Sequence, residues 1–202
     1  MRSKAIPVPD GSLSDGTVSL RFRRASDLDA IAVASYDHDT RRWLTDPPMD
    51  EQARAASMAR AAEAFATGRS APLVIADHRT SEPIGLINLQ FRDDHVATIA
   101  YSVFPAHRGK GVAPRAVRLM AEWAFCRLGL TELLLEIDQE NAASVRVAEK
   151  CGFEVAERGR GGEPGSDGGG KLVFVARKRA TGVTGAAGAA GAAGAAGGAS
   201  GG

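Results

Sequence analysis

The sequence predicts a single α/β domain with a mixed sheet flanked by helices. Segments that alternate apolar and polar residues, as half-buried strands do, are interspersed with segments whose apolar residues recur at helical spacing. This order of elements is typical of an α/β domain with a mixed sheet. The chain has 202 residues, 44% of them hydrophobic, which is enough to fill one core of ordinary size. We therefore expect one domain over residues 16–180.

The first half of this domain is expected to contain one strand, two helical regions and three further strands. Residues 17–24, "TVSLRFRR", alternate as a strand that buries one face. Residues 26–44 and 49–68 carry apolar side chains at helical spacing, and Gly68 ends the second of these regions. Short turn-rich segments then join three strands, which we expect at residues 71–78, 83–91 and 95–104.

The second half alternates helices with strands. Residues 113–128 form the most strongly patterned helix, because Val117, Met120 and Ala124 fall on one face and Gly129 follows as a stop. The remaining elements are expected at residues 132–137 (strand), 141–151 (helix), 153–159 (strand) and 171–178 (strand).

The two ends of the chain differ from the middle. We expect residues 1–15 to be a flexible segment, and they contain no apolar run that resembles a signal peptide. Residues 181–202 are a Gly/Ala-rich repeat with no large side chain to bury, so we expect a disordered tail. No stretch offers the roughly 20 apolar residues that would span a bilayer.

Charge and cysteine content narrow the class of protein. The chain carries 25 basic and 24 acidic residues, for a formal charge of +1, which argues against a dedicated nucleic-acid binder. The two cysteines, Cys126 and Cys151, fall within helical patterns, where small buried hydrophobic residues are more typical than disulfide partners. We expect a cytoplasmic protein without a nucleic-acid or membrane partner, and both a monomer and a homodimer stay open.

A glycine-rich turn, "HRGKGVAPRAV", lies between a predicted strand and a predicted helix. Backbone N–H groups at a helix N-terminus are unpaired and carry the positive end of the helix dipole, so they suit a phosphate that can approach closely. Gly109, Gly111 and Ala113 leave room for that approach, and Arg108 and Lys110 add positive charge. The turn is therefore a candidate phosphate site.

Two familiar phosphate motifs fit this turn poorly. A P-loop needs Ser or Thr after its Gly-Lys pair, but Lys110 is followed by Gly111, so the hydroxyl that would hold magnesium is missing. A dinucleotide fingerprint would match two glycines and then meet Pro114, and a lone glycine spacing is weak support for a nucleotide-binding oxidoreductase. An ordinary strand-to-helix turn without a ligand remains an alternative.

Residues 103–153 resemble the GNAT superfamily of acyl-CoA-dependent N-acyltransferases, in particular its RimJ/RimL-like branch. The pyrophosphate loop of that family reads R/Q-x-x-G-x-G/A, and "RGKGVA" fits it at Arg108, Gly111 and Ala113. Downstream, "NAASVRVAEKCGF" is similar to a second segment of the branch at Asn141, Ser144, Glu149, Lys150, Gly152 and Phe153. The two motifs occur in the family's order and at its usual separation.

The resemblance implies a mostly antiparallel GNAT-like sheet, acetyl-CoA as co-substrate and no metal. In the family one strand diverges from its neighbour beside the pyrophosphate loop, and the amides of pantetheine could pair there as an added strand would. Asn141 could cap the helix that follows it, contact the cofactor, or do both. The expected cofactor-binding residues are Tyr101, Val103, Arg108, Gly109, Lys110, Gly111, Val112, Ala113, Asn141 and Ser144.

Amide formation from a thioester needs a neutral amine, a stabilised oxyanion and a proton for the leaving thiolate. Many GNAT enzymes have a tyrosine where Ala148 stands, and the branch often has a glutamate where Thr98 stands. Ser144 is then the leading candidate to protonate or hydrogen-bond the sulfur, and Glu136 is a weaker candidate base. An acyl-CoA-binding domain with little or no turnover is the alternative function.

The basicity of an amine narrows the choice of acceptor, because only the neutral amine can attack the thioester. About a tenth of an α-amine with a pKa of roughly 7.8 is neutral at pH 7, against a few parts in ten thousand of a lysine with a pKa of about 10.4. A site without a strong base therefore favours a protein N-terminus or another weakly basic small-molecule amine. We expect residues 36–48 to form a substrate wall, where Trp43 lies and where Asp37, Asp39 and Asp46 could attract a cationic amine.

Overall fold

The computed structural model describes residues 5–9, 13–44, 47–158 and 170–178. The strands are β1 (Leu13–Ser14), β2 (Val18–Arg21), β3 (Ser70–Asp77), β4 (Pro83–Phe91), β5 (Val96–Val103), β6 (Glu132–Asp138), β7 (Glu154–Arg158) and β8 (Lys171–Arg177). The α-helices are α1 (Leu28–Ser35), α2 (His38–Trp43), α3 (Glu51–Ala66), α4 (Val112–Cys126) and α5 (Ala142–Lys150), and the short 3-10 helices are η1 (Ala25–Asp27) and η2 (Pro105–His107). The expected order of strands and helices is confirmed, except that β1 is an addition and the first expected helix is divided into α1 and α2.

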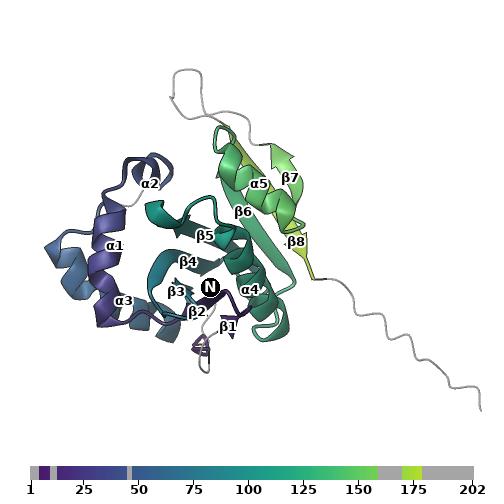
Figure 1. Ribbon diagram of the computed structural model, residues 1–202. Helices are drawn as coiled ribbons and strands as arrows, with labels where there is room; N and C mark the ends of the chain where they lie inside the picture. The colour runs from purple at the N-terminus through teal and green to yellow at the C-terminus, as the bar shows by residue number, and fades with distance from the viewer. Residues whose placement is uncertain (1–4, 10–12, 45–46, 159–169, 179–202) are drawn as a thin grey trace, which may run out of the picture.

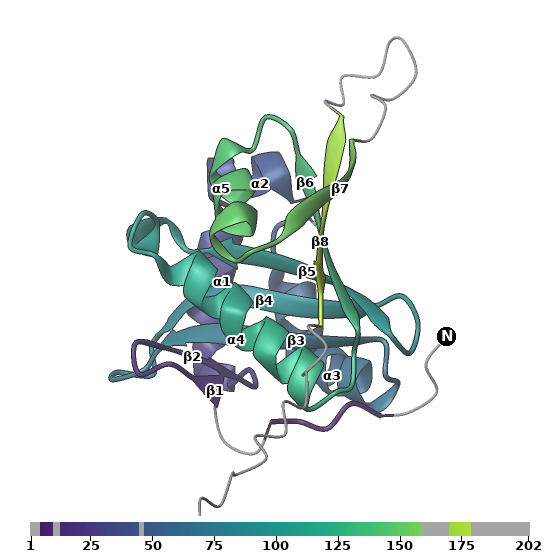
Figure 2. The same cartoon turned by 90° about the vertical axis from the view of Figure 1, so that its right-hand side faces the viewer.

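Within the described residues the strands form one sheet in the order β1-β2-β3-β4-β5-β6-β8-β7. All neighbouring pairs are antiparallel except β5 and β6, which are parallel and connected through α4. Helices α4 and α5 cover one face of the sheet, and α1 and α3 lie on the other (Figures 1 and 2). The predicted α/β domain with a mixed, mostly antiparallel sheet is confirmed.

The largest part of the core lies between the sheet and α4. Val117, Met120 and Ala124 are 0% exposed, as their predicted common face requires. Side chains alternate along β5, so that Ala97 and Ile99 join this core while Thr98 lies on the other face. A second, smaller cluster packs α1 against the opposite face of the sheet.

The helical region expected over residues 26–44 is divided in two. Helix α1 ends at Ser35, and α2 begins after Asp37, whose Oδ2 accepts the Thr40 N–H at 2.8 Å. An Asp in this N-cap position satisfies an otherwise unpaired N–H and favours a new helix start. The break sets α2 apart at the end of the sheet where β5 and β6 diverge (Figure 1).

The cysteines differ from their expected burial. Cys126 is exposed on the last turn of α4, so the prediction of a buried residue there is wrong. Cys126 follows the buried Ala124 by two residues, which places it on the other side of the helix. Cys151 is half-buried at the end of α5, and both thiols are free.

Part of the N-terminal segment is packed rather than free. Ile6 is 3% exposed and donates its backbone N–H to the carbonyl oxygen of Phe65 at 2.9 Å. Asp15 forms an ion pair with Arg115 of α4, with 2.7 Å between Oδ2 and Nη1. The predicted tail at residues 181–202 and most of the loop before β8 lie outside the described residues. None of the helices in the described part of the chain is long and apolar enough to cross a membrane.

Candidate functional site

A cavity opens where β5 and β6 separate. The two strands pair in parallel from Val96 and Glu132 to Thr98 and Leu134, and no pairing continues beyond that point. The cavity has a volume of about 410 Å³. Its lining residues come from α2 (Asp39, Thr40, Trp43 and the adjoining Leu44), β5 (Tyr101, Ser102, Val103), the β5–α4 connection and the start of α4 (His107, Arg108, Gly109, Gly111, Val112, Ala113, Pro114), and α5 with its N-cap (Asn141, Ala143, Ser144, Arg146, Val147, Lys150).

The N-terminus of α4 meets this cavity without a side chain in the way. Gly111 is the N-cap, and it supplies no side-chain hydrogen bond to the first turn. Gly109 and Gly111 both have φ of +75°, in the left-handed region that favours glycine. Pro114 lies in the first turn, where its missing N–H does no harm. The first N–H groups of α4 are thus open to an anionic ligand.

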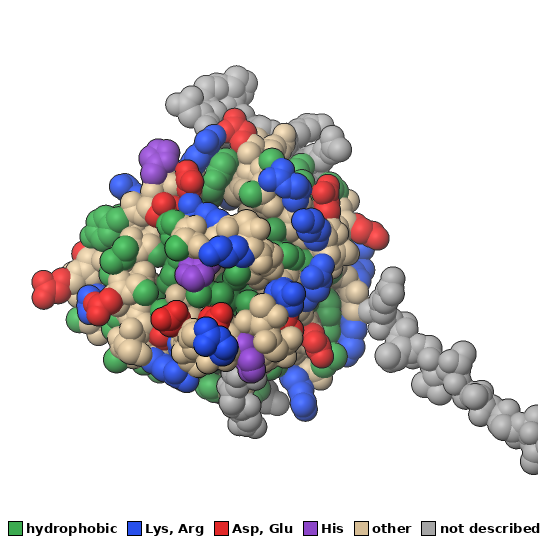
Figure 3. Space-filling view, in the orientation of Figure 1, with side chains coloured by type: hydrophobic (Ala, Val, Ile, Leu, Met, Phe, Trp, Pro, Cys, Tyr) green, Lys and Arg blue, Asp and Glu red, His purple; other side chains and the backbone are tan. Residues whose placement is uncertain are grey.

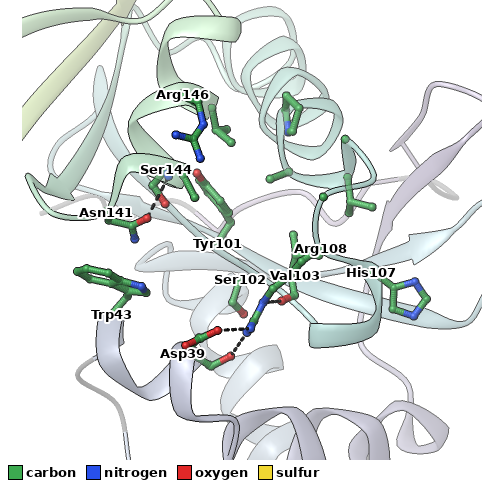
Figure 4. Close-up of a pocket in the computed structure, with 18 of the residues that line it drawn as sticks. Asp39, Trp43, Tyr101, Ser102, Val103, His107, Arg108, Asn141, Ser144 and Arg146 are labelled. Atoms are coloured by element: carbon green, nitrogen blue, oxygen red, sulfur yellow. Dashed lines mark hydrogen bonds and ion pairs between the residues drawn. The ribbon is translucent and has the colours of Figure 1, made fainter.

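Arg108, the expected pyrophosphate ligand, is engaged with α2 instead. Its Nη2 lies 2.5 Å from Asp37 Oδ2. Its Nη1 lies 3.2 Å from Asp39 Oδ2, and its Nε donates to the carbonyl oxygen of Val103 at 3.2 Å (Figure 4). The Arg108 guanidinium and the Thr40 N–H lower the pKa of Asp37. Arg108 therefore lines the cavity, but its guanidinium is already ion-paired with two carboxylates, one on α2 and one at its N-cap.

Other cations surround the α4 N-terminus. Lys110, Arg146 and Lys150 are exposed, and the latter two line the cavity. Arg118 Nη2 donates to the carbonyl oxygen of Lys150 at 2.5 Å and so connects α4 with α5. Figure 3 shows basic side chains gathered over the α4 and α5 side of the molecule. These cations are placed to neutralise phosphate groups bound at α4.

Asn141 acts as the N-cap of α5. Its Oδ1 accepts the backbone N–H of Ser144 at 3.0 Å, which confirms the capping role that the sequence predicted. Because the cap uses only the side-chain oxygen, the amide nitrogen can serve a ligand. This cap holds the first turn of α5, with Ser144, at the cavity wall.

Tyr101 and Ser144 lie side by side at the cavity wall. Figure 4 shows the Tyr101 ring rising from β5 with its hydroxyl directed toward Ser144. That hydroxyl oxygen is buried and has no hydrogen-bond partner of standard geometry among the described residues. Burial raises the pKa of Tyr101 to about 12, and the adjacent Ser144 side chain acts in the opposite direction.

Glu136 does not join the other predicted site residues. It is absent from the cavity lining and lies on the sheet face opposite α4, since it shares a face with Leu134, the partner of Thr98. Its Oε1 is 2.5 Å from Nη2 of Arg92, whose Nε donates to Thr98 Oγ1 at 3.0 Å. We therefore do not retain Glu136 as a candidate base.

The cavity also contains residues to which the sequence analysis gave no role. Ser102, His107 and Arg146 all line it. Arg146 could have been found from its spacing, because it lies one helical turn before Lys150 on the exposed side of α5. Asp46, one of the expected acidic residues, lies outside the described residues. No cluster of His, Cys, Asp or Glu that could hold a metal occurs in the described part of the chain.

Residues 18–154 match the family described as "Acetyltransferase (GNAT) domain", and the chain belongs to that family. A stretch of 77 residues is 35% identical to the spermidine N(1)-acetyltransferase of Escherichia coli strain K12; it covers 37% of this chain and 41% of that enzyme. The match thus spans about two fifths of the relative's length. The resemblance to the GNAT superfamily seen in the sequence is confirmed.

Solved structures of low sequence identity share the fold. A RimL ribosomal L7/L12 alpha-N-protein acetyltransferase in complex with coenzyme A has a TM-score of 0.71 at 15% identity, over 86% of this chain and 98% of that one. The spermidine N-acetyltransferase of Vibrio cholerae in complex with CoA and spermine has a TM-score of 0.68 at 19% identity, over 81% of this chain and 96% of that one.

Proposed function

We propose that this protein transfers the acetyl group of acetyl-CoA directly to a primary amine. The supporting observation is that two features meet at one cavity: the unobstructed N-terminus of α4, and the edge of β5 beyond Thr98, which no longer pairs with β6. The first suits a pyrophosphate, and the second suits the amides of pantetheine. A cofactor held by both would bring its thioester close to Ser144.

The residues that would hold the cofactor differ in one respect from the sequence-based expectation. The backbone of residues 109–113 would bind the pyrophosphate, with Lys110, Arg146 and Lys150 supplying charge. Arg108 would act mainly through α2, because its guanidinium is already ion-paired. Ser144 would donate a hydrogen bond to the sulfur, and Asn141 would offer its amide nitrogen.

The cavity walls favour an amine that carries a single positive charge. Asp39 is the one carboxylate among the described lining residues, and Arg108 offsets its charge. A polyamine would bring several ammonium groups, each of which needs a compensating charge or hydrogen bond when it leaves water. We therefore propose a protein N-terminal α-amine, or another weakly basic primary amine, as the acceptor.

The test combines binding with turnover. Acetyl-CoA at 100 times its dissociation constant should raise the free energy of unfolding by about 2.7 kcal/mol, measured by thermal shift, whereas NADP⁺ should not. Incubation with acetyl-CoA and a peptide that has a free α-amine should then release free thiol. A peptide that contains lysine but has a blocked α-amine, and spermidine, should release none. No stabilisation by acetyl-CoA would refute the cofactor assignment, and faster release with spermidine would refute the acceptor.

An acyl-CoA-binding domain with little turnover is the second candidate. Two observations favour it: Ala148 is 0% exposed and Thr98 is 5% exposed, and neither side chain can supply an acid or base at the positions where family members often do. This alternative predicts stabilisation by acetyl-CoA together with no thiol release from any amine in the panel.

A further inference from the structure

The Tyr101 hydroxyl is a buried polar group that lacks a hydrogen bond of standard geometry. Its oxygen is inaccessible to solvent and has no hydrogen-bond partner of standard geometry within the described residues, although other atoms of the side chain line the cavity. A buried hydroxyl without a partner costs roughly 1–3 kcal/mol. A phenylalanine would fill the same space without that cost. The hydroxyl is therefore more easily explained by a role in the site than by packing.

The surroundings of this hydroxyl locate it over one face of α5. Ser144, Ala148 and Cys151 lie on that face, because they are spaced four and three residues apart. The Tyr101 hydroxyl is close enough to Ser144 for a weak hydrogen bond that falls short of standard geometry, and it interacts electrostatically with Cys151, so it lies over this face of α5. Ala148 is fully buried in the same core that Tyr101 packs against. The Tyr101 side chain therefore extends from the sheet to this face of α5.

We propose that Tyr101 is the proton source behind Ser144, with its phenolic O–H donating to Ser144 Oγ so that the Ser144 O–H donates to the thioester sulfur. This inference rests on the acetyl transfer proposed above. Tyr101 acts through Ser144 because its own oxygen is shielded from the cavity, whereas Ser144 is half-buried and lines it. Tyr101 is thus a positioning residue.

The proton balance of the step is as follows. The amine nitrogen bonds to the thioester carbonyl carbon, the C–S bond breaks, and its electron pair stays on sulfur. Ser144 gives its proton to the sulfur and receives the phenolic proton of Tyr101. As CoA leaves, a proton from solvent returns to Tyr101 through Ser144. The proton lost by the amine goes to water. Burial raises the pKa of Tyr101 to about 12, so the phenol is protonated before each turnover.

The first test compares Tyr101→Phe with Thr131→Val, which removes an exposed hydroxyl before β6, away from the cavity lining. Tyr101→Phe should lower kcat about tenfold or more while the dissociation constant of acetyl-CoA changes less than about twofold. Because the variant keeps the ring and loses at most one hydrogen bond, worth about 1 kcal/mol, its Tm should fall by no more than about 2–4 °C. A larger fall in Tm that accompanies the fall in kcat would indicate a structural role and overturn the proposal.

A double-mutant cycle tests the order of the relay. If Tyr101 acts through Ser144, then Tyr101→Phe combined with Ser144→Ala should have the same kcat as Ser144→Ala alone. Multiplied effects of the two substitutions would mean that they act independently and would overturn the relay.

A second readout needs no acceptor. CoA is bound to each variant and its thiol is titrated through the ultraviolet absorbance of the thiolate, with CoA-free protein as the blank to remove the signals of Cys126 and Cys151. The thiol pKa of bound CoA should be higher by roughly 0.5–1 in Tyr101→Phe and Ser144→Ala than in wild type and Thr131→Val. Arg146 and Lys150 also favour the thiolate, but they are the same in all four proteins.

The outcomes separate this inference from the function on which it rests. If CoA binds but the thiol pKa is the same in Tyr101→Phe and wild type, the relay is refuted and the proposed function stands. If CoA binds to none of the proteins, the proposed function fails, and the relay fails with it.

Discussion

Gly111 satisfies two demands at once, and both come from its missing side chain. Its φ of +75° costs a residue with a Cβ roughly 1–2 kcal/mol. A Cβ at this position would meet nothing within 4 Å in the protein itself, so the space beside it is open to a ligand. The glycine therefore permits both the entry of the chain into α4 and the close approach of a phosphate.

Gly111→Val should abolish acetyl-CoA binding in a protein that still folds. The branched side chain would occupy the space next to the first N–H groups of α4, and it would also strain the backbone. Gly129→Val is the matched control, because Gly129 has φ of +74°, has open space around it and follows the other end of α4. Both variants should lose similar Tm, and isothermal titration should detect acetyl-CoA binding only to Gly129→Val. Binding to Gly111→Val would show that the pyrophosphate site is elsewhere.

At the scale of elements, α2 is held by contacts from two loops. Arg108, before α4, contacts Asp37 and Asp39, and Glu140, before α5, pairs with Arg42 at 3.0 Å. The Arg42 pair is more than half exposed on both sides, and such pairs contribute about 0–1 kcal/mol. Arg108 is more enclosed and makes several charged hydrogen bonds, so it should dominate. It thereby fixes one wall of the cavity relative to the cofactor loop.

Arg108→Gln should loosen α2 more than it weakens cofactor binding. Hydrogen exchange of the backbone amides of residues 38–43 should accelerate, because Asp37 and Asp39 lose their partner. The dissociation constant of acetyl-CoA should rise by less than the roughly tenfold that the loss of a charged hydrogen bond to phosphate would cause. Arg177→Gln is the control, since Arg177 pairs with Glu132 at 3.0 Å, away from the cavity. A large loss of affinity with unchanged exchange would restore Arg108 as a pyrophosphate ligand.

At the scale of the whole molecule, a buried ion pair connects three parts of the fold. Arg21 of β2 and Asp27 of η1 are 6% and 1% exposed, and their two hydrogen bonds measure 2.7 and 2.8 Å. Arg21 also donates to the carbonyl oxygen of Ser81 in the β3–β4 turn at 2.8 Å. Burial raises the pKa of Asp27, but the hydrogen bonds from Arg21 and from the Arg24 N–H outweigh this effect, so its pKa is lowered.

Asp27→Asn should destabilise the protein by about 3–5 kcal/mol, because it leaves the buried Arg21 guanidinium without a counter-charge. Urea unfolding measures the loss. Glu132→Gln breaks the exposed pair with Arg177 and should cost less than about 1 kcal/mol. Equal losses in the two variants would mean that burial of the Arg21 pair has no energetic weight.

The same pair gives the stability of the wild type a pH dependence. The pKa of Asp27 in the folded protein is below its ordinary value of 3.8, so its contribution is fully present above that value. The contribution is lost as the pH falls through the lower folded pKa. In Asp27→Asn the free energy of unfolding should therefore fall less steeply below pH 4 than in the wild type.

Local chemistry made much of the fold and part of the site predictable from the sequence. Periodicity identified the strands and helices, because burial of one face imposes a period of about 2 or 3.6 residues wherever the core lies. The glycines before α4 and the cap at Asn141 were also predictable, since each satisfies backbone groups within a few residues of itself. For the same reason the position of the candidate cofactor loop could be predicted before the structure was known.

Only the tertiary structure decided how distant side chains are paired. Sheet register put Glu136 on the face opposite α4, and the docking of α2 directed Arg108 to Asp37 and Asp39. The meeting of Tyr101 with Ser144 depends on how α5 packs against β5, across more than 40 residues of chain. None of these contacts has a local signature, because each is set by the balance of packing and charge over the whole domain. The sequence by itself therefore determined most of the elements and the position of the candidate cofactor loop, and the tertiary structure decided which groups face the cavity.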